Sequence, residues 1–264
     1  MSLTRLPSFV FIALLCAVSL CVLPSCIKQP SQPPVSVIDN TQMLQWLQAR
    51  QYRHHSLCAL AQVKMTQNGK SWSTTQALLV ATPNRLRIDM INFFGQLLVQ
   101  LSVDGPQLNA YVPRDKTHYF GMPTLDNIKR FTGLPLPITD LVALLLGKMP
   151  LGVLETAQVT AWEKGLIFST AAGVDYRVEF DGKRVVDLLY SVNNYTVYHV
   201  KYGPYVGDNN YPQQLILQAP MNDVGVVVKF DELELNSTLS KQQFKLVLPE
   251  NTLSRSLSQS EETL

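Results

Sequence analysis

The histidines and carboxylates are the side chains of this 264-residue chain that could bind a metal or transfer protons. His54 and His55 are adjacent, so in an extended segment they point to opposite faces and cannot bind one metal together. His118 and His199 each stand apart from the other histidines. The chain has no G-x-S-x-G, H-E-x-x-H, P-loop or G-x-G-x-x-G pattern. We therefore predict no catalytic residue, no metal site and no cofactor, and the chain is not expected to be an enzyme.

Cys26 is the residue whose chemistry the sequence defines best. A single cation, Arg5, precedes an apolar run from Phe9 to Val22, and Leu23-Pro24-Ser25-Cys26 follows. The run is too short to span a bilayer, which takes about 20 apolar residues, and it is typical of the h-region of an export signal. The four residues ending at Cys26 resemble the bacterial lipobox, in which the thiol receives a diacylglyceryl group and becomes the mature N-terminus. An ordinary secretory signal cut near Ser25 is the alternative.

This interpretation also accounts for the other cysteines. Cys16 and Cys21 lie within the predicted signal peptide, residues 1–25, so the mature chain keeps Cys58 as its free thiol and cannot form an intramolecular disulfide. Cys58 lies between Leu57 and Ala59, and we predict that it is a small buried hydrophobic side chain rather than a nucleophile.

The charge and composition of the remainder indicate one β-domain. The net charge of +2 falls to +1 when Arg5 is removed, which argues against nucleic-acid binding. Residues 26–38 are Pro-rich and are expected to form a lipidated tether. Residues 39–249 are long enough for one large domain, and residues 250–264, rich in Ser, Glu and Thr, are predicted to be a disordered tail.

Two sequence periods define the elements of this domain. Apolar residues recur at helical spacing over 41–52, and the period changes to two from Leu57 to Thr66, before the hairpin signal Asn68-Gly69. Short turns then separate a series of further strands, which predicts an antiparallel sheet that is long and strongly curved or closed. These strands are expected over 72–80, 86–90, 97–103, 108–112, 117–120, 174–180 and 224–230.

A helical segment interrupts the strands between about 124 and 147. The sequence predicts a short helix over 124–131, the loop 132–137 and a second helix over 139–146 that ends at Gly147. The second helix is almost wholly apolar, so one face can pack on the sheet while another still needs cover or a ligand.

Three segments, Leu86–Gly95, Phe131–Pro137 and Leu144–Gly147, resemble the lipoprotein-localisation family, whose members include the periplasmic carrier LolA and the outer-membrane receptor LolB. The resemblance extends from about Trp46 to Pro150 and continues as strand patterning thereafter, without a counterpart for the Tyr-rich stretch 190–211. It implies a mainly β fold, an unclosed antiparallel half-barrel covered by a helical lid, whose apolar cavity receives acyl chains of a lipoprotein in transit. Because this chain is itself expected to be a lipoprotein, it is more similar to the receptor.

The resemblance also implies the site residues. In the receptor, a large apolar residue projects just before the glycine that matches Gly95 and assists delivery into the membrane, which assigns this role to Phe94, with Phe93 beside it. Packing of both rings into the sheet is the alternative. The expected cavity wall and lid residues are Leu134, Leu136, Leu141, Leu144 and Leu145. Plain core packing, the commoner role of leucine, is the alternative for them.

The implied partners are acylated lipoproteins or lipids, a periplasmic lipoprotein carrier, and a membrane reached through the N-terminal lipid anchor. Ile27 follows the anchor, and the absence of an aspartate there is compatible with sorting to the periplasmic face of the outer membrane. Two alternatives remain: a structural or partner-binding outer-membrane lipoprotein without lipid cargo, and a periplasmic hydrolase. A large apolar cavity under the lid favours carriage, a filled core favours scaffolding, and a polar cleft favours an enzyme.

Overall fold

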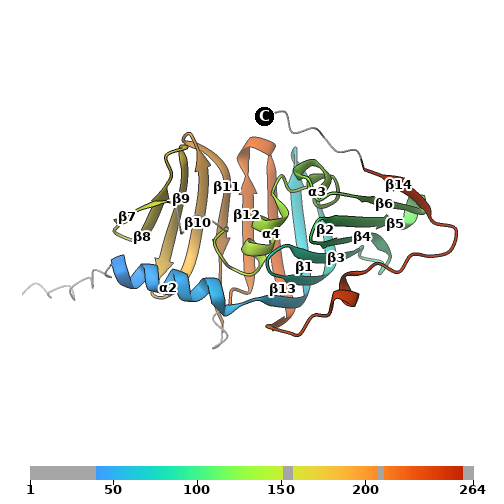
Figure 1. Ribbon diagram of the computed structural model, residues 1–264, viewed down its shortest axis with the longest axis horizontal. Helices are drawn as coiled ribbons and strands as arrows, with labels where there is room; N and C mark the ends of the chain where they lie inside the picture. Colours follow the sequence, from blue (N-terminus) through green and yellow to red (C-terminus); the bar gives the residue numbers. More distant parts are fainter. Residues whose placement is uncertain (1–39, 151–156, 207–210, 258–264) are drawn as a thin grey trace, which may run out of the picture. The chain divides into compact units, whose positions relative to one another are not determined.

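Fourteen strands join in one β-sheet in the computed structural model, which describes residues 40–150, 157–206 and 211–257 (Figure 1). These residues belong to the unit Ile38–Leu264. The other unit, Met1–Val37, lies outside the described residues, and so do the predicted signal peptide and Cys26. Within the described part, no helix is long and apolar enough to cross a membrane.

Most strands begin or end close to the residues that the period-two pattern predicts. The strands are β1 (Ser56–Gln67), β2 (Lys70–Ala81), β3 (Arg85–Ile91), β4 (Leu97–Asp104), β5 (Gln107–Val112), β6 (Thr117–Gly121), β7 (Gln158–Trp162), β8 (Gly165–Ser169), β9 (Val174–Asp181), β10 (Arg184–Val192), β11 (Tyr195–Tyr202), β12 (Gln214–Ala219), β13 (Val224–Leu235) and β14 (Leu253–Ser256).

The sheet is open, as predicted. Its strand order is β14-β6-β5-β4-β3-β2-β1-β13-β12-β11-β10-β9-β8-β7, so β14 and β7 are its two edges. Every neighbouring pair is antiparallel except β14 with β6. The pairing of β1 with β13, in which Val63 lies opposite Val228, joins segments from the two ends of the domain. This long-range pairing makes β1 a central strand.

Three α-helices accompany the sheet in the described residues: α2 (Asn40–Arg53), α3 (Leu125–Thr132) and α4 (Ile138–Leu145). Each lies within two residues of a predicted helix. The Thr124 side chain accepts a hydrogen bond from the backbone N–H of Asn127 (3.3 Å) and begins α3. Gly133, with φ of +73°, ends it in the left-handed conformation that favours glycine. Figure 1 shows α3 and α4 over one face of the sheet.

The core lies on the sheet face that α2, α3 and α4 cover. Alternate residues of β1 point into it, because successive side chains of a strand point to opposite faces. The predicted inward set, Leu57, Ala59, Ala61, Val63 and Met65, is buried throughout. Helix α2 contributes Met43 and Leu47, which lie on its buried side.

The predicted disordered tail is wrong for residues 250–257. Leu253–Ser256 form β14, in which Leu253 lies opposite Thr117 of β6. Leu257 is buried against Gly121. The polar composition misled the prediction, because an edge strand is held by backbone hydrogen bonds that do not depend on apolar side chains. Residues 258–264 lie outside the described residues.

Candidate functional site

An apolar cavity of about 530 Å³ lies between the sheet and the helices α3 and α4. Five strands, β1, β2, β3, β12 and β13, supply its floor, and α3, α4 and the loop between them supply its roof. The apolar floor residues are Val63, Met65, Trp72, Leu78, Ile88, Met90, Leu215, Leu217, Val226 and Val228. The apolar roof residues are Phe131, Leu134, Leu141, Leu144 and Leu145.

The floor is apolar because side chains alternate between the two faces of each strand, and the apolar side chains are those that point toward the cavity. In β1, Val63 and Met65 face the cavity, whereas Lys64 between them belongs to the opposite face. Val226 and Val228 of β13 repeat the pattern and lie opposite Met65 and Val63. The cavity floor is therefore built from cross-strand pairs of aliphatic and thioether side chains.

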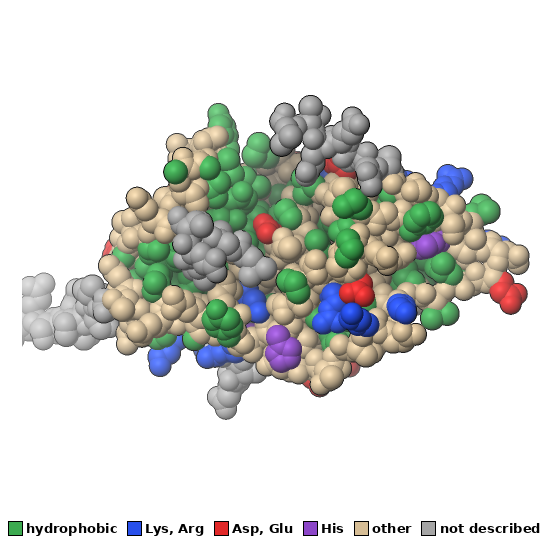
Figure 2. Space-filling model, viewed as in Figure 1, with side chains coloured by type: hydrophobic (Ala, Val, Ile, Leu, Met, Phe, Trp, Pro, Cys, Tyr) green, Lys and Arg blue, Asp and Glu red, His purple; other side chains and the backbone are tan. Residues whose placement is uncertain are grey.

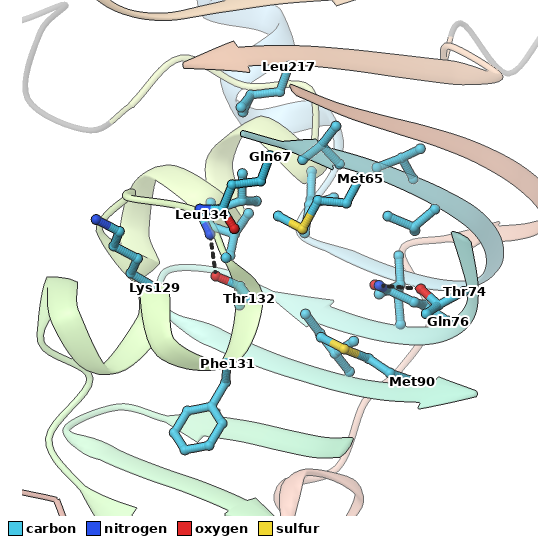
Figure 3. A pocket seen from close by; sticks show the side chains of 18 of the residues that line it. Met65, Gln67, Thr74, Gln76, Met90, Lys129, Phe131, Thr132, Leu134 and Leu217 are labelled. Carbon is cyan, nitrogen blue, oxygen red and sulfur yellow. Dashed lines mark hydrogen bonds between the residues drawn. The ribbon is translucent and has the colours of Figure 1, made fainter. Parts of the chain in front are cut away.

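The roof approaches the floor closely at the end of α3. A Cβ atom at Gly133 would meet the flexible end of the Met65 side chain, and the positive φ favours glycine at this position. The Thr132 hydroxyl donates to the Ile128 carbonyl (2.8 Å) and accepts from the Leu134 N–H (3.1 Å; Figure 3). These bonds turn the chain so that Leu134 faces the cavity.

The polar side chains that line the cavity are Gln67, Thr74, Gln76, Asp126, Lys129, Arg130 and Thr132. Gln76 donates to the Thr74 hydroxyl (3.1 Å) on the floor (Figure 3). Asp126, Lys129 and Arg130 of α3 are exposed and line the cavity on the roof side.

Helix α4 is held at its C-terminal end by buried polar side chains that the sequence did not single out. The last carbonyls of a helix have no partner within the helix, and a buried end requires donors from elsewhere. Arg50 Nε of α2 donates to the Gly147 carbonyl, and the hydroxyls of Tyr202 and Tyr211 donate to the carbonyls of Leu144 (3.4 Å) and Leu145, respectively.

These donors are buried. Arg50 is 9% exposed, its guanidinium carbon lies 5.6 Å from the centroid of the Tyr202 ring, and it has no ion-pair partner among the described residues. Burial raises the pKa of Tyr202 and of Tyr211, which keeps both hydroxyls protonated as donors. A buried arginine in α2, a tyrosine at the end of β11 and a buried tyrosine before β12 bind the same helix end, and this common partner is defined only by the fold.

The predicted cavity leucines separate into two sets. Leu134, Leu141, Leu144 and Leu145 line the cavity. Leu136 does not, which corrects the prediction for this residue: it is buried in the core at 1% exposure. The loop turns after Leu134, so that the alternate residue packs beside the cavity instead of into it.

Phe93 and Phe94 lie at the turn between β3 and β4 and are 94% and 82% exposed. Their rings meet edge to face with centroids 5.7 Å apart. The Asn92 carboxamide oxygen accepts from the N–H groups of Phe94 (2.9 Å) and Gln96 (2.9 Å), which fixes the turn. Packing of both rings into the sheet, the alternative weighed above, is not observed.

The remaining candidate groups have structural surroundings. Cys58 is half-buried, and therefore less enclosed than predicted. His199 Nε2 contacts Asp187 (2.7 Å), and His118 lies within hydrogen-bond distance of Asn109 and Ser254. Among the described residues, no three His, Cys, Asp or Glu side chains are grouped so that they could hold a metal ion.

The Tyr-rich stretch belongs to β10, β11 and the segment after them. Tyr176, Tyr190 and Tyr198 are cross-strand partners in β9, β10 and β11, with ring centroids 4.5 and 4.9 Å apart in succession. Phe168 of β8 extends this row, and Asp140 of α4 lies near it. Burial raises the pKa of Asp140. Figure 2 shows hydrophobic side chains gathered over β10–β12 beside α4, with few charged side chains among them.

Comparison with known proteins assigns the fold. No protein-family model matches the chain, and no curated protein matches its sequence. A LolA superfamily protein from Nitrosomonas europaea aligns with 79% of this chain and 98% of its own, at 9% identity and a TM-score of 0.53. A DUF1329 family protein from Desulfovibrio piger aligns with 78% of this chain and 97% of its own, at 9% identity and a TM-score of 0.50.

A further solved structure, an outer-membrane lipoprotein-sorting protein domain from Vibrio parahaemolyticus, covers 78% of this chain and 97% of its own, at 11% identity. Its TM-score is 0.49. At these identities the likeness defines the fold alone. The chain is thus an open-sheet protein with a helical lid and an apolar cavity, similar in fold to the LolA superfamily.

Proposed function

We propose that this protein binds acyl chains of lipoproteins, or of similar amphiphiles, in the cavity under α3 and α4 and aids their insertion into the outer membrane. The observation that carries the proposal is the apolar cavity of about 530 Å³. Each methylene removed from water contributes about 0.8 kcal/mol, so an acyl chain needs apolar walls and no catalytic group. The cavity favours carriage over the alternative of a scaffold without lipid cargo, whose core would be filled.

The anchor and the membrane partner complete the proposal. Diacylglyceryl modification of Cys26 would hold the domain at the periplasmic face of the outer membrane, where a periplasmic carrier would deliver cargo to it. Cys26→Ala should abolish incorporation of radiolabelled palmitate and release the protein from the membrane fraction. Label that persists in the variant would show that the lipidation site is elsewhere.

Binding of a fluorescent fatty acid to the full chain, and its displacement by an acylated peptide, tests the cavity. Leu145→Glu places a carboxylate against the acyl chain and should weaken binding at least about 10-fold, because burying an unpaired charge is costly. Met90→Glu is the second variant, because Met90 is half-buried and a polar side chain is better tolerated there.

Leu253→Glu is the matched control, since Leu253 is 60% exposed on β14, away from the cavity. The control should bind like the parent. If both cavity variants keep their parental melting temperature and their parental affinity, the acyl chains do not bind beneath α3 and α4.

A further inference from the structure

The volume of the cavity sets how much lipid it can hold. A methylene occupies about the volume of a water molecule in the liquid, roughly 30 Å³. A cavity of about 530 Å³ therefore accepts one acyl chain of about 16 to 18 carbons. Two such chains would need about twice this volume.

The roof restricts enlargement of the cavity. Helix α4 supplies Leu141, Leu144 and Leu145 to the wall, and its C-terminal carbonyls are bound by Arg50, Tyr202 and Tyr211. Moving α4 outward would break these buried hydrogen bonds and leave polar groups without partners, which is unfavourable. The capacity of the cavity is thus fixed by the same contacts that hold its roof.

The charged side chains on the roof side of the cavity indicate the chemistry of the ligand's headgroup. Three charged side chains of α3 lie there, Asp126, Lys129 and Arg130, and together they carry one net positive charge. The Arg130 guanidinium lies over the Tyr119 ring, 4.9 Å from its centroid. Lys129 is exposed, forms no ion pair with another described residue, and extends outward from α3 (Figure 3).

We infer that the ligand is a single-chain anionic amphiphile, whose one acyl chain fills the cavity while its carboxylate or phosphate lies beside Lys129. A fatty acid and a lysophospholipid share this chemistry. The inference rests on the proposed function, since both use the same cavity. It selects the single-chain amphiphiles of that proposal over lipoproteins, whose diacylglyceryl group carries two chains, and it assigns the headgroup a negative charge.

A series of saturated fatty acids measures the capacity. Affinity for the full chain should rise about 4-fold for each methylene and level off at about 16 to 18 carbons, with one molecule bound per protein in native mass spectrometry. Val226→Phe fills part of the floor and should bring the plateau to a shorter chain. Val227→Phe, one residue along on the opposite face of β13, is the matched control and should leave the plateau unchanged.

Headgroup variants measure the charge preference at pH 8. A 16-carbon fatty acid and a 16-carbon lysophosphatidate should both bind more tightly than the methyl ester of the acid. The ratio of the dissociation constants of the two anions shows whether a carboxylate or a phosphate headgroup is preferred. Lys129→Glu should weaken binding of both anions about 5- to 10-fold without changing the ester. Lys183→Glu, the same charge change at the exposed β9–β10 turn, should have no effect.

The outcomes separate this inference from the proposed function. If neither the anions nor the ester bind, the proposed function fails and the inference fails with it. If the ester binds as tightly as the acid, if Lys129→Glu has no effect, or if affinity keeps rising beyond 20 carbons with two molecules bound, only the inference is overturned.

Discussion

Two parts of the same sheet face differ in what fills them. Under α3 and α4, the floor formed by β1, β2, β3, β12 and β13 carries mainly valine, leucine and methionine, and a cavity remains. Across β8 to β11, the inward row is Phe168, Tyr176, Tyr190 and Tyr198, and the three tyrosine rings contact one another in succession. Helix α2 adds Trp46 against Phe180 beside this row.

Both parts obey the same alternation of strand side chains, so alternation alone does not produce a binding site. Side-chain size and the distance of the covering helix decide whether the enclosed space is filled. Aromatic side chains bury the most area and fill the space between layers, whereas aliphatic side chains beneath a fixed roof leave volume for a ligand. The packed part should therefore carry the stability of the domain, and the cavity part its binding.

The largest expected effect is on the unfolding free energy, when one leucine in each part is replaced by alanine. Leu188 of β10 is 1% exposed in the packed part, and Leu217 of β12 is 2% exposed at the cavity wall. Leu188→Ala should cost about 3 to 5 kcal/mol of unfolding free energy, and Leu217→Ala about 2 to 3, because Leu217 already borders empty space and loses fewer contacts.

Urea unfolding of the full chain measures both changes through the shift in the transition midpoint. Equal losses would mean that the two parts are packed alike and that the comparison does not hold.

The second effect is the response to acid of His54, which follows α2 and lies outside both strand sets compared above. His54 of the α2 end is 6% exposed and meets the Tyr211 ring edge to face, with centroids 5.6 Å apart. Burial and the neighbouring cations Arg50, Arg53, Lys148 and His55 lower its pKa from 6.5 to about 4. The native state therefore favours the neutral imidazole, while the unfolded chain takes up a proton near pH 6.5.

Stability from His54 is thus present above pH 6.5 and is lost as the pH falls toward 4, by about 2 to 3 kcal/mol in total. His54→Phe keeps the ring contact and removes the proton site, so its unfolding free energy should change less over this range. His55→Phe, at the exposed neighbour, should keep the parental slope. Asp140 acts in the opposite sense, because its raised pKa gives stability that is lost as the pH rises. Parental behaviour of His54→Phe in urea titrations at pH 4 to 7 would exclude this assignment.

The sequence predicted the elements of the cavity part better than those of the packed part. The helices over 124–131 and 139–146 agree with α3 and α4 because capping residues and apolar periodicity act locally. The turn at Asn68-Gly69 joins β1 and β2 for the same reason, since its residues alone favour a tight hairpin.

What the sequence did not predict depends on contacts between distant residues. The floor contributed by β12 and β13 reaches the cavity only because β13 pairs with β1, more than 150 residues earlier. The polar anchoring of α4 by Arg50 and Tyr211 likewise requires the fold, since each residue alone suggests ordinary burial. The volume of the cavity is a space between elements, and no local pattern encodes it. Leu136 is an example. Its apolar side chain suits a cavity wall, but the path of the loop places that side chain in the core.

The smallest expected effect on stability concerns Phe94, whose replacement should instead slow the delivery of cargo to membranes. Its ring is 82% exposed at the β3–β4 turn and contributes little to either part of the core. Phe94→Ala should therefore change the unfolding free energy by less than about 0.5 kcal/mol, so the melting temperature stays within a few degrees of the parent.

An exposed ring can enter the membrane interface and hold the protein against lipid, which shortens the aqueous step that an acyl chain must cross. We predict that Phe94→Ala binds a fluorescent acylated peptide with parental affinity but transfers it to liposomes several-fold more slowly. Phe120→Ala removes another exposed ring, on β6 near the edge strand, and should transfer at the parental rate. If Phe94→Ala transfers cargo at the parental rate, the ring has no role in delivery. If Phe94→Ala and Phe120→Ala slow transfer equally, any exposed ring has the same effect and the β3–β4 turn has no specific role.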